Sequence, residues 1–263
     1  MYEEKIQDRL YVKSEKLDKI CGIRHGFTSA CGGFGEKIKG FNLGFRTGEL
    51  WENIMQNYQA AAADLGLTIE NTVSARQSHT DNVRVVQESD RGEGLLKDCK
   101  IYDTDALVTN LKNTPLLVFS ADCIPVLFAD KDGRAIGAAH CGWRGTRLKI
   151  AAKAVRVMCE EFNILPKNII AAIGPGIGRC CFETGADVAE QFDEKFVFAA
   201  ENGKYFVDLK AANASALESA GVLKENIFVS DICTKCRCGE FYSYRAQKEK
   251  TGRQGAFIEI ADN

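Results

Sequence analysis

The stretch LLVFSADCIPVLFAD, residues 116–130, contains two apolar runs separated by the short segment SADC. Apolar runs of about four to eight residues between turn residues are typical of strands buried in a sheet. The pattern returns in AIGAAH (135–140), NIIAAI (168–173) and QGAFIEIAD (254–262). We therefore expect several buried strands, and we expect the strand in 116–130 to be broken at Asp122 and Cys123.

Helical patterns alternate with these strands. One expected helix lies in the segment 49–67 and ends at Gly66, and the others cover residues 146–162, 184–193 and 208–220. In the second, Leu148, Ala151, Ala152, Val155 and Cys159 recur at helical spacing. Interleaved strands and helices without a linker predict a single layered α/β domain. We assign residues 1–263 to it, with 1–24 as its N-terminal extension.

Turn residues indicate how the N-terminal half is connected. The Gly-rich segment 29–48 predicts turns and a loop. Residues 71–79 and 82–89 are both typical of strands, and the residues from His79 to Asn82 predict a turn between them. His79 would then lie at a strand end, where loops expose side chains on a rigid scaffold.

Composition excludes several classes of protein. The 263 residues are 45% hydrophobic and 27% charged, with a net charge of −2, which gives no reason to expect binding to nucleic acid or to an acidic membrane. The N-terminus lacks the apolar core of a signal peptide, and no apolar run approaches the roughly 18 residues of a membrane span. We expect a cytoplasmic protein and leave its oligomeric state open.

Eleven cysteines are an odd number, so they cannot all pair within one chain. Without a secretory signal, free thiols or metal ligands are favoured over a disulfide framework. Cys233 and Cys236 form a C-x-x-C, half of a zinc knuckle, followed by Cys238. No second spaced pair is present, because Cys180 and Cys181 are adjacent. The sequence thus favours partly solvated thiols here over a second metal site.

His79, Cys123 and His140 each occupy a strand end or strand break in this scheme. Two imidazoles and one thiolate can bind Zn²⁺, and a catalytic zinc keeps its fourth position for water or substrate. Each residue alone also suits a structural role, and separations of 44 and 17 residues are not a local metal motif. Convergence of the three is therefore a hypothesis at this point.

Several segments together resemble the YfiH-type family, also named the polyphenol oxidase, laccase-domain or purine nucleoside phosphorylase family, which includes proteins named peptidoglycan editing factor. They are HGFTS (25–29), FNLGFRTG (41–48), RQSHTDNV (76–83), SADCIPVLFAD (120–130), GAAHCGWRGT (137–146), IGPGIGRCCFE (173–183), and FYSYR (241–245) with TGRQGAFI (251–258). They follow the family's order from about residue 25 to 260. The resemblance implies a single α/β/β/α sandwich domain.

The resemblance also implies a site made of His79, Cys123 and His140, holding Zn²⁺ with Cu²⁺ as the alternative metal. The implied chemistry is phosphorolysis of adenosine, inosine, guanosine and S-methyl-5′-thioadenosine, and adenosine deamination, so the partners are a nucleoside and phosphate. Cys141 stands where alanine is common, and strand alternation should turn it away from His140. Asn42 is a candidate for binding a sugar hydroxyl, or caps a turn. Arg144 is a candidate for binding phosphate, or forms a surface ion pair.

Three other readings compete with this one. Cys123 could be the nucleophile of a metal-free hydrolase, with His140 or His79 as base, acting on an amide such as a misincorporated amino acid in a peptidoglycan precursor. A structural zinc is disfavoured, because such sites close all four positions with protein ligands. Multicopper oxidation is disfavoured, because it needs on the order of ten histidines, imidazole being the usual copper ligand. This chain has three histidines.

Overall fold

The computed structural model describes residues 1–262, and within that range the strands form two six-stranded sheets and one three-stranded sheet. The first sheet consists, in order, of β1 (Tyr2–Ile6), β2 (Arg9–Lys13), β3 (Ile23–Thr28), β15 (Gln254–Ile260), β7 (Leu116–Ser120) and β4 (Val73–Ser74). The second consists of β14 (Ile227–Val229), β10 (Ile169–Ile173), β8 (Ile124–Asp130), β9 (Ile136–Cys141), β6 (Ala106–Thr109) and β5 (Val83–Val85).

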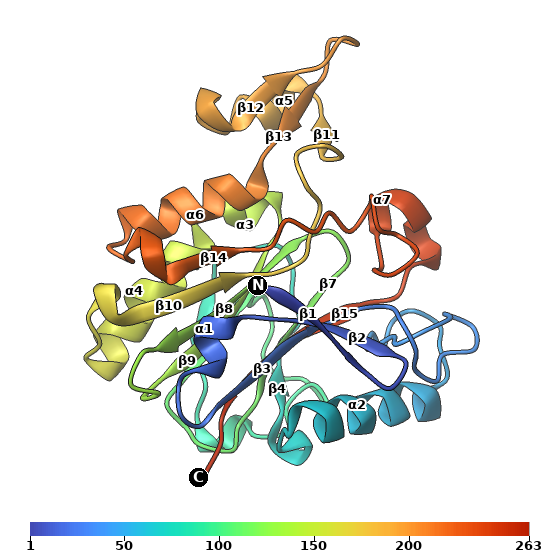
Figure 1. Cartoon of the computed structure of the whole chain (residues 1–263), viewed down its shortest axis with the longest axis vertical. Helices are drawn as coiled ribbons and strands as arrows, with labels where there is room; N and C mark the ends of the chain where they lie inside the picture. The colour runs from blue at the N-terminus through green and yellow to red at the C-terminus, as the bar shows by residue number, and fades with distance from the viewer. Residues whose placement is uncertain (263) are drawn as a thin grey trace.

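The two large sheets pack face to face, and helices cover their outer faces (Figure 1). Between the sheets, Val118 and Ile258 of the first meet Leu127 and Ala138 of the second. Helix α2 (Trp51–Leu65) covers the first sheet, whereas α4 (Ile150–Phe162) and α6 (Leu209–Ser219) cover the second. Burial of both faces explains the near-continuous apolar strands. The expected α/β/β/α sandwich is confirmed.

The chain passes between the sheets at one end of the sandwich. It leaves the first sheet after β4 and enters the second at β5, and it does so again between β7 and β8. The expected break at residues 122–123 is this second crossing, where Asp122 has a φ of 89°. The C-terminal end of β9 lies beside the start of β8, since Cys141 pairs with Ile124. Loops from both sheets therefore meet at this end.

Some expected elements differ from the structure. Residues 71–79 and 82–89 do not form adjacent strands of one sheet: β4 and β5 are short and belong to different sheets. The helix expected over 146–162 is divided into α3 (Trp143–Arg147) and α4, because Lys149 takes a left-handed conformation with φ of 58°. The helix expected over 184–193 is reduced to α5 (Ala186–Ala189).

The remaining elements are small. The three-stranded sheet of β11 (Glu183–Thr184), β13 (Tyr205–Val207) and β12 (Val197–Ala199) projects beyond α6 (Figure 1). Short helices α1 (Glu15–Asp18) and α7 (Tyr244–Gln247) lie in the connections. Among residues 1–262, no helix has the length and apolar character required to cross a membrane.

Candidate functional site

His79, Cys123 and His140 meet where the chain crosses between the sheets. His79 lies in the crossing from β4 to β5, Cys123 in that from β7 to β8, and His140 near the end of β9. One ligand atom from each lies within 4.8 Å of the others. Cys123 Sγ is 3.7 Å from His79 Nε2, and the two imidazole rings are 4.9 Å apart at an angle of 75°. Three residues far apart in sequence thus form one compact group of two imidazoles and a thiol.

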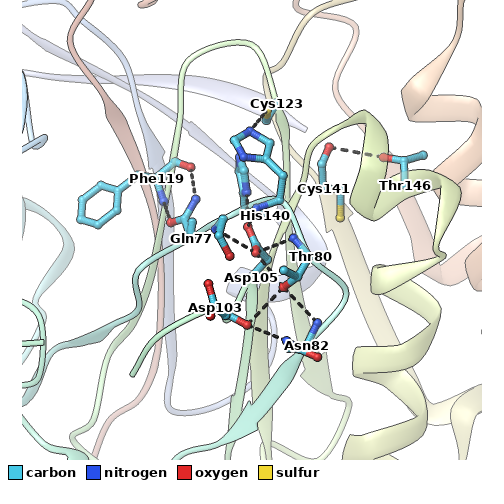
Figure 2. Close-up of polar contacts among 12 residues, drawn as sticks. Gln77, Thr80, Asn82, Asp103, Asp105, Phe119, Cys123, His140, Cys141 and Thr146 are labelled. Carbon is cyan, nitrogen blue, oxygen red and sulfur yellow. Dashed lines mark hydrogen bonds and ion pairs between the residues drawn. The ribbon is translucent and has the colours of Figure 1, made fainter. Parts of the chain in front are cut away.

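Asp105 holds the two histidines in place, and sequence reasoning missed it. Its carboxylate accepts the backbone N–H groups of Ser78 (3.1 Å), His79 (3.1 Å) and Thr80 (2.8 Å), and Oδ1 lies 2.8 Å from Nδ1 of His140 (Figure 2). Successive N–H groups around a left-handed residue, here His79 with φ of 65°, form a concave anion-binding turn. The contact with Asp105 leaves Nε2 of His140 for the cavity.

Charges within the group shift its pKa values in opposite directions. Burial acts to raise the pKa of the Cys123 thiol, but His140 and His79 overcome this and lower it to about 6. Burial acts to lower the pKa of His140, yet Cys123 and Asp105 raise it to about 9. Burial also opposes ionisation of Asp105, but the contacts with His140 and the loop N–H groups lower its pKa to about 2. Without a metal, the group is therefore a thiolate–imidazolium pair near neutral pH.

Cys141 and His25 lie outside this group. Cys141 is completely buried among the apolar residues between the second sheet and α4, and its sulfur points toward the helical side, away from Cys123 (Figure 2). Burial raises the pKa of its thiol well above the ordinary value. His25 is buried in β3, where Nε2 accepts the backbone N–H of Ser14 at 2.8 Å. The position of Cys141 agrees with the strand alternation expected from sequence.

The donor set fits a zinc ion. In a tetrahedral site with Zn–S of about 2.3 Å and Zn–N of about 2.0–2.1 Å, sulfur and nitrogen lie about 3.6 Å apart. The Cys123–His79 separation of 3.7 Å is close to this value. Metal-bound histidines commonly donate their second N–H to a carboxylate, which fixes the ring, and Asp105 has this relation to His140.

A cavity of about 670 Å³ opens above the three side chains. Aromatic side chains that line it are Phe45, Trp51, Phe119, Trp143, Phe182 and Tyr244. Among residues 1–262, the arginines that line it are Arg46, Arg76, Arg245 and Arg253. A volume of this size suits a small organic ligand. Flat aromatic faces beside guanidinium groups suit a planar heterocycle accompanied by an anion.

Asn42 and Arg144 do not line this cavity within the part of the chain that the structure describes. Asn42 is completely buried: its amide donates to Thr47, and its Oδ1 accepts the N–H groups of Gly44 and Arg253. It therefore holds the two loops together, as a turn-capping residue does. Arg144 is exposed, with its guanidinium 4.4 Å from the ring centre of Trp143. The cavity's cations come from elsewhere in the chain.

Gly142 allows His79 and Cys123 to approach each other. Its backbone conformation suits any residue, but a Cβ atom there would lie 2.7 Å from His79 Cδ2 and 3.2 Å from Cys123 Sγ. We expect Gly142→Ala to lower activity about 10- to 100-fold by displacing these side chains, while the protein stays folded. Gly239→Ala is the control, because that position faces open space. Turnover by the two variants, measured beside their thermal unfolding, checks this; equal activity would contradict it.

Comparison with known proteins matches almost the whole chain. A family model described as multi-copper polyphenol oxidoreductase laccase matches residues 24–261. The purine nucleoside phosphorylase YlmD of Bacillus subtilis is 32% identical over 241 residues, covering 89% of this chain and 87% of that protein. The adenosine deaminase RL5 from an unknown prokaryotic organism is 33% identical over 222 residues, covering 81% and 84% of the two chains.

Two solved structures show the same fold. The crystal structure of YlmD from Geobacillus stearothermophilus superposes with a TM-score of 0.90 at 30% identity, covering 98% of each chain. The crystal structure of the Bacillus licheniformis hypothetical protein YfiH gives a TM-score of 0.89 at 31% identity over 97% of each chain. The sandwich, the order of its motifs and these relatives together show that the chain belongs to the YfiH family of laccase-domain proteins.

Proposed function

We propose that this protein is a zinc-dependent purine nucleoside enzyme. It cleaves adenosine, inosine, guanosine and S-methyl-5′-thioadenosine by phosphorolysis, and it deaminates adenosine. The observation that carries the proposal is the group of His79, Cys123 and His140 at the base of a cavity lined by aromatic rings and arginines. Relatives named purine nucleoside phosphorylase and adenosine deaminase support the substrate class.

His79, Cys123 and His140 would hold the zinc ion. When bound, zinc supplies Lewis acidity at the base of the cavity. Asp105 keeps His140 oriented through Nδ1. The hydrogen bonds that its carboxylate accepts from the N–H groups of residues 78–80 keep His79 beside Cys123. His79 is the exposed member of the group, so its side is open to substrate.

In phosphorolysis, a phosphate oxygen forms a bond to C1′ of the ribose while the C1′–N9 bond breaks. The bond's electron pair goes to the purine, which leaves as a base after gaining a proton. The enzyme must hold phosphate near C1′ and stabilise the leaving base. We assign the first task to Arg253, because it lines the cavity and a guanidinium group matches the oxygens of phosphate. The aromatic residues of the wall supply stacking surfaces for the second.

Deamination needs water in place of phosphate. Water adds to C6 of adenosine, the C6–N6 bond breaks, and ammonia and inosine result. The two reactions therefore give different products from one substrate: adenine if phosphate attacks C1′, inosine if water attacks C6. Adenosine incubated with purified protein across a phosphate titration tests the function. We expect adenine to rise with phosphate and inosine to form without it; no product in either arm would overturn the proposal.

A single arginine should separate the two reactions. We expect Arg253→Ala to raise the KM for phosphate and to slow phosphorolysis by about 10- to 100-fold, since charge-assisted contacts to an anion contribute about 1.5–3 kcal/mol. Deamination should fall much less, because no phosphate enters its transition state. Arg144→Ala is the matched control, since Arg144 is exposed and lies outside the cavity lining of the described residues.

The product ratio decides the outcome of this comparison. If adenine and inosine fall equally in Arg253→Ala, the arginine serves the fold or the nucleoside rather than phosphate. If Arg144→Ala alone raises the KM for phosphate, the anion binds where the sequence first suggested. Both variants are measured at several phosphate concentrations, so that a change in KM is distinguished from a change in kcat.

The thiolate–imidazolium pair of Cys123 and His140 favours a second candidate, a Cys–His amide hydrolase. Alkylation distinguishes the two. Because the pKa of Cys123 is lowered to about 6 from 9.0, its thiolate persists to lower pH than an ordinary thiol. In chelator-treated protein we expect iodoacetamide to modify Cys123 with a midpoint near pH 6. Zinc-loaded protein should be protected; equal labelling with and without zinc would favour the hydrolase.

A further inference from the structure

Four cysteines outside the site described above also converge. Cys180, Cys181, Cys233 and Cys236 place their sulfur atoms within 4.8 Å of one another. Cys236 Sγ lies 3.5 Å from Cys180 Sγ and 3.4 Å from Cys181 Sγ. All four are free thiols. The adjacent pair, which offered no metal-binding spacing by itself, is completed by the C-x-x-C pair about fifty residues further along the chain.

The fold brings the two pairs together by strand pairing. Strands β10 and β14 run parallel, with Ile173 opposite Val229, and the pairing resumes beyond the strands where Gly176 bridges to Cys233. The N–H of Thr234 donates to the carbonyl of Gly176 at 3.2 Å. The two cysteine loops thus leave the same end of the second sheet side by side.

The surroundings suit sulfur atoms that carry negative charge. The backbone N–H of Gly178 donates to Cys233 Sγ at 3.2 Å. Lys210 is buried, and its ammonium group donates to the carbonyls of Ser230 at 2.7 Å and Ile232 at 2.6 Å, next to Cys233. A buried cation and an N–H donor offset the excess charge of a thiolate-rich metal site.

We propose that Cys180, Cys181, Cys233 and Cys236 bind one Zn²⁺ ion in a second, structural site. Four protein ligands close all four positions of a tetrahedral zinc, as structural sites require. With Zn–S of about 2.3 Å, tetrahedral sulfurs lie about 3.8 Å apart, near the observed 3.4 and 3.5 Å. A single disulfide would use two of the sulfurs, whereas one zinc ion uses all four, and all four are free thiols.

This second site would brace the wall of the catalytic cavity. Ile177 and Phe182, on either side of the first cysteine pair, line that cavity. Both cysteine loops also contact Asp122, the neighbour of Cys123: the N–H of Ile177 donates to its carbonyl at 2.7 Å, and the hydroxyl of Thr234 to its carboxylate at 2.7 Å. Zinc joining the loops would restrain both contacts.

Metal content per chain tests the proposal. Protein is purified under reducing conditions, loaded with Zn²⁺ alone and freed of excess metal. We expect two zinc ions in the wild type, one in Cys123→Ala, one in Cys233→Ser/Cys236→Ser, and none when these changes are combined. Cys238→Ser, an exposed cysteine outside the group, is the control and should keep two. Zinc in the second site is thus measured in Cys123→Ala protein, independently of nucleoside turnover.

Thiol labelling of the wild type gives a second readout, which does not depend on whether a substituted protein folds. In zinc-loaded wild type, N-ethylmaleimide should modify Cys238 at once and the four clustered cysteines only after chelation, as mapped by mass spectrometry. Replacement of zinc by Co²⁺ should give the strong sulfur-to-cobalt absorption of a multi-thiolate site, and this absorption should persist in Cys123→Ala. Zinc-free Cys123→Ala protein, or a disulfide among the four in reduced preparations, would overturn the proposal.

Discussion

Replacing Cys123 with alanine is expected to abolish nucleoside turnover together with zinc binding at the His79–Cys123–His140 group. The sulfur is one of three donors, and it lies 3.7 Å from His79 Nε2. Loss of a ligand weakens the metal, and loss of the metal removes its Lewis acidity. We expect a fall in kcat/KM of about a thousandfold or more, which corresponds to ~4 kcal/mol of transition-state stabilisation. Initial rates and metal analysis of the same preparation check this.

Cys99→Ala is the matched control for that experiment. Cys99 also lines the cavity, but its sulfur faces the backbone carbonyls of Ser74 and Ile101 rather than the histidines. We expect it to retain zinc at the His79–Cys123–His140 group and most of its activity. Full turnover by Cys123→Ala would refute the mechanism. Loss of zinc with retained turnover would mean that the metal is not the catalytic group.

Asp105→Asn is the second large effect. One carboxylate oxygen of Asp105 accepts the N–H groups of Ser78 and Thr80, and the other accepts that of His79 and contacts His140. An amide has only one accepting oxygen. The NH₂ group of the asparagine would therefore face backbone N–H donors that a carboxylate oxygen accepts in the wild type. We expect a loss of about 10- to 100-fold in zinc affinity and activity, and of about 1–3 kcal/mol in stability, because buried donors are left unsatisfied.

Asp103→Asn controls for the same chemical change two residues earlier. Asp103 is exposed, and its backbone carbonyl, not its carboxylate, accepts bonds from Thr80 and Asn82 (Figure 2). Asparagine also tolerates its left-handed conformation, with φ of 46°. In zinc titration and denaturant unfolding, we expect this variant to have a zinc affinity and a stability close to those of the wild type. An Asp105→Asn protein with unchanged zinc affinity would show that the carboxylate does not position the site.

The buried strands and the break at Cys123 could be predicted from sequence because both leave a local pattern of apolar runs and turn residues. Strand partners depend on contacts between distant residues, and this is why the sequence predicted strands on both sides of the turn at His79 to Asn82 but not that β4 and β5 lie in different sheets. Strand β1 was missed for another reason. Its alternating YEEKI is typical of a partly solvated edge strand, and it carries more charge than the buried runs.

Within the site, the role of Asp105 could not be predicted from sequence for the same reason as the strand partners. Its position becomes informative only through strand register: Ala106 pairs with Ala139, which places Asp105 beside His140. The carboxylate in YDTDALV has no feature of its own that distinguishes it from the preceding Asp103. Arg144 is the converse case. The GWRG motif drew attention to Arg144, whereas the arginines that line the cavity lie in other family-like segments, where none of them was singled out.

The position of β15 bears on how this chain is made. Residues 254–260 pair with β3 on one side and with β7 on the other, so a strand that is synthesised long after both of its partners fills the middle of the first sheet. A nascent chain still lacking this segment presents two open strand edges, which are prone to pair with other chains. The ribosome must therefore extend the chain through β15 before the sheet whose strand β7 leads to Cys123 can close.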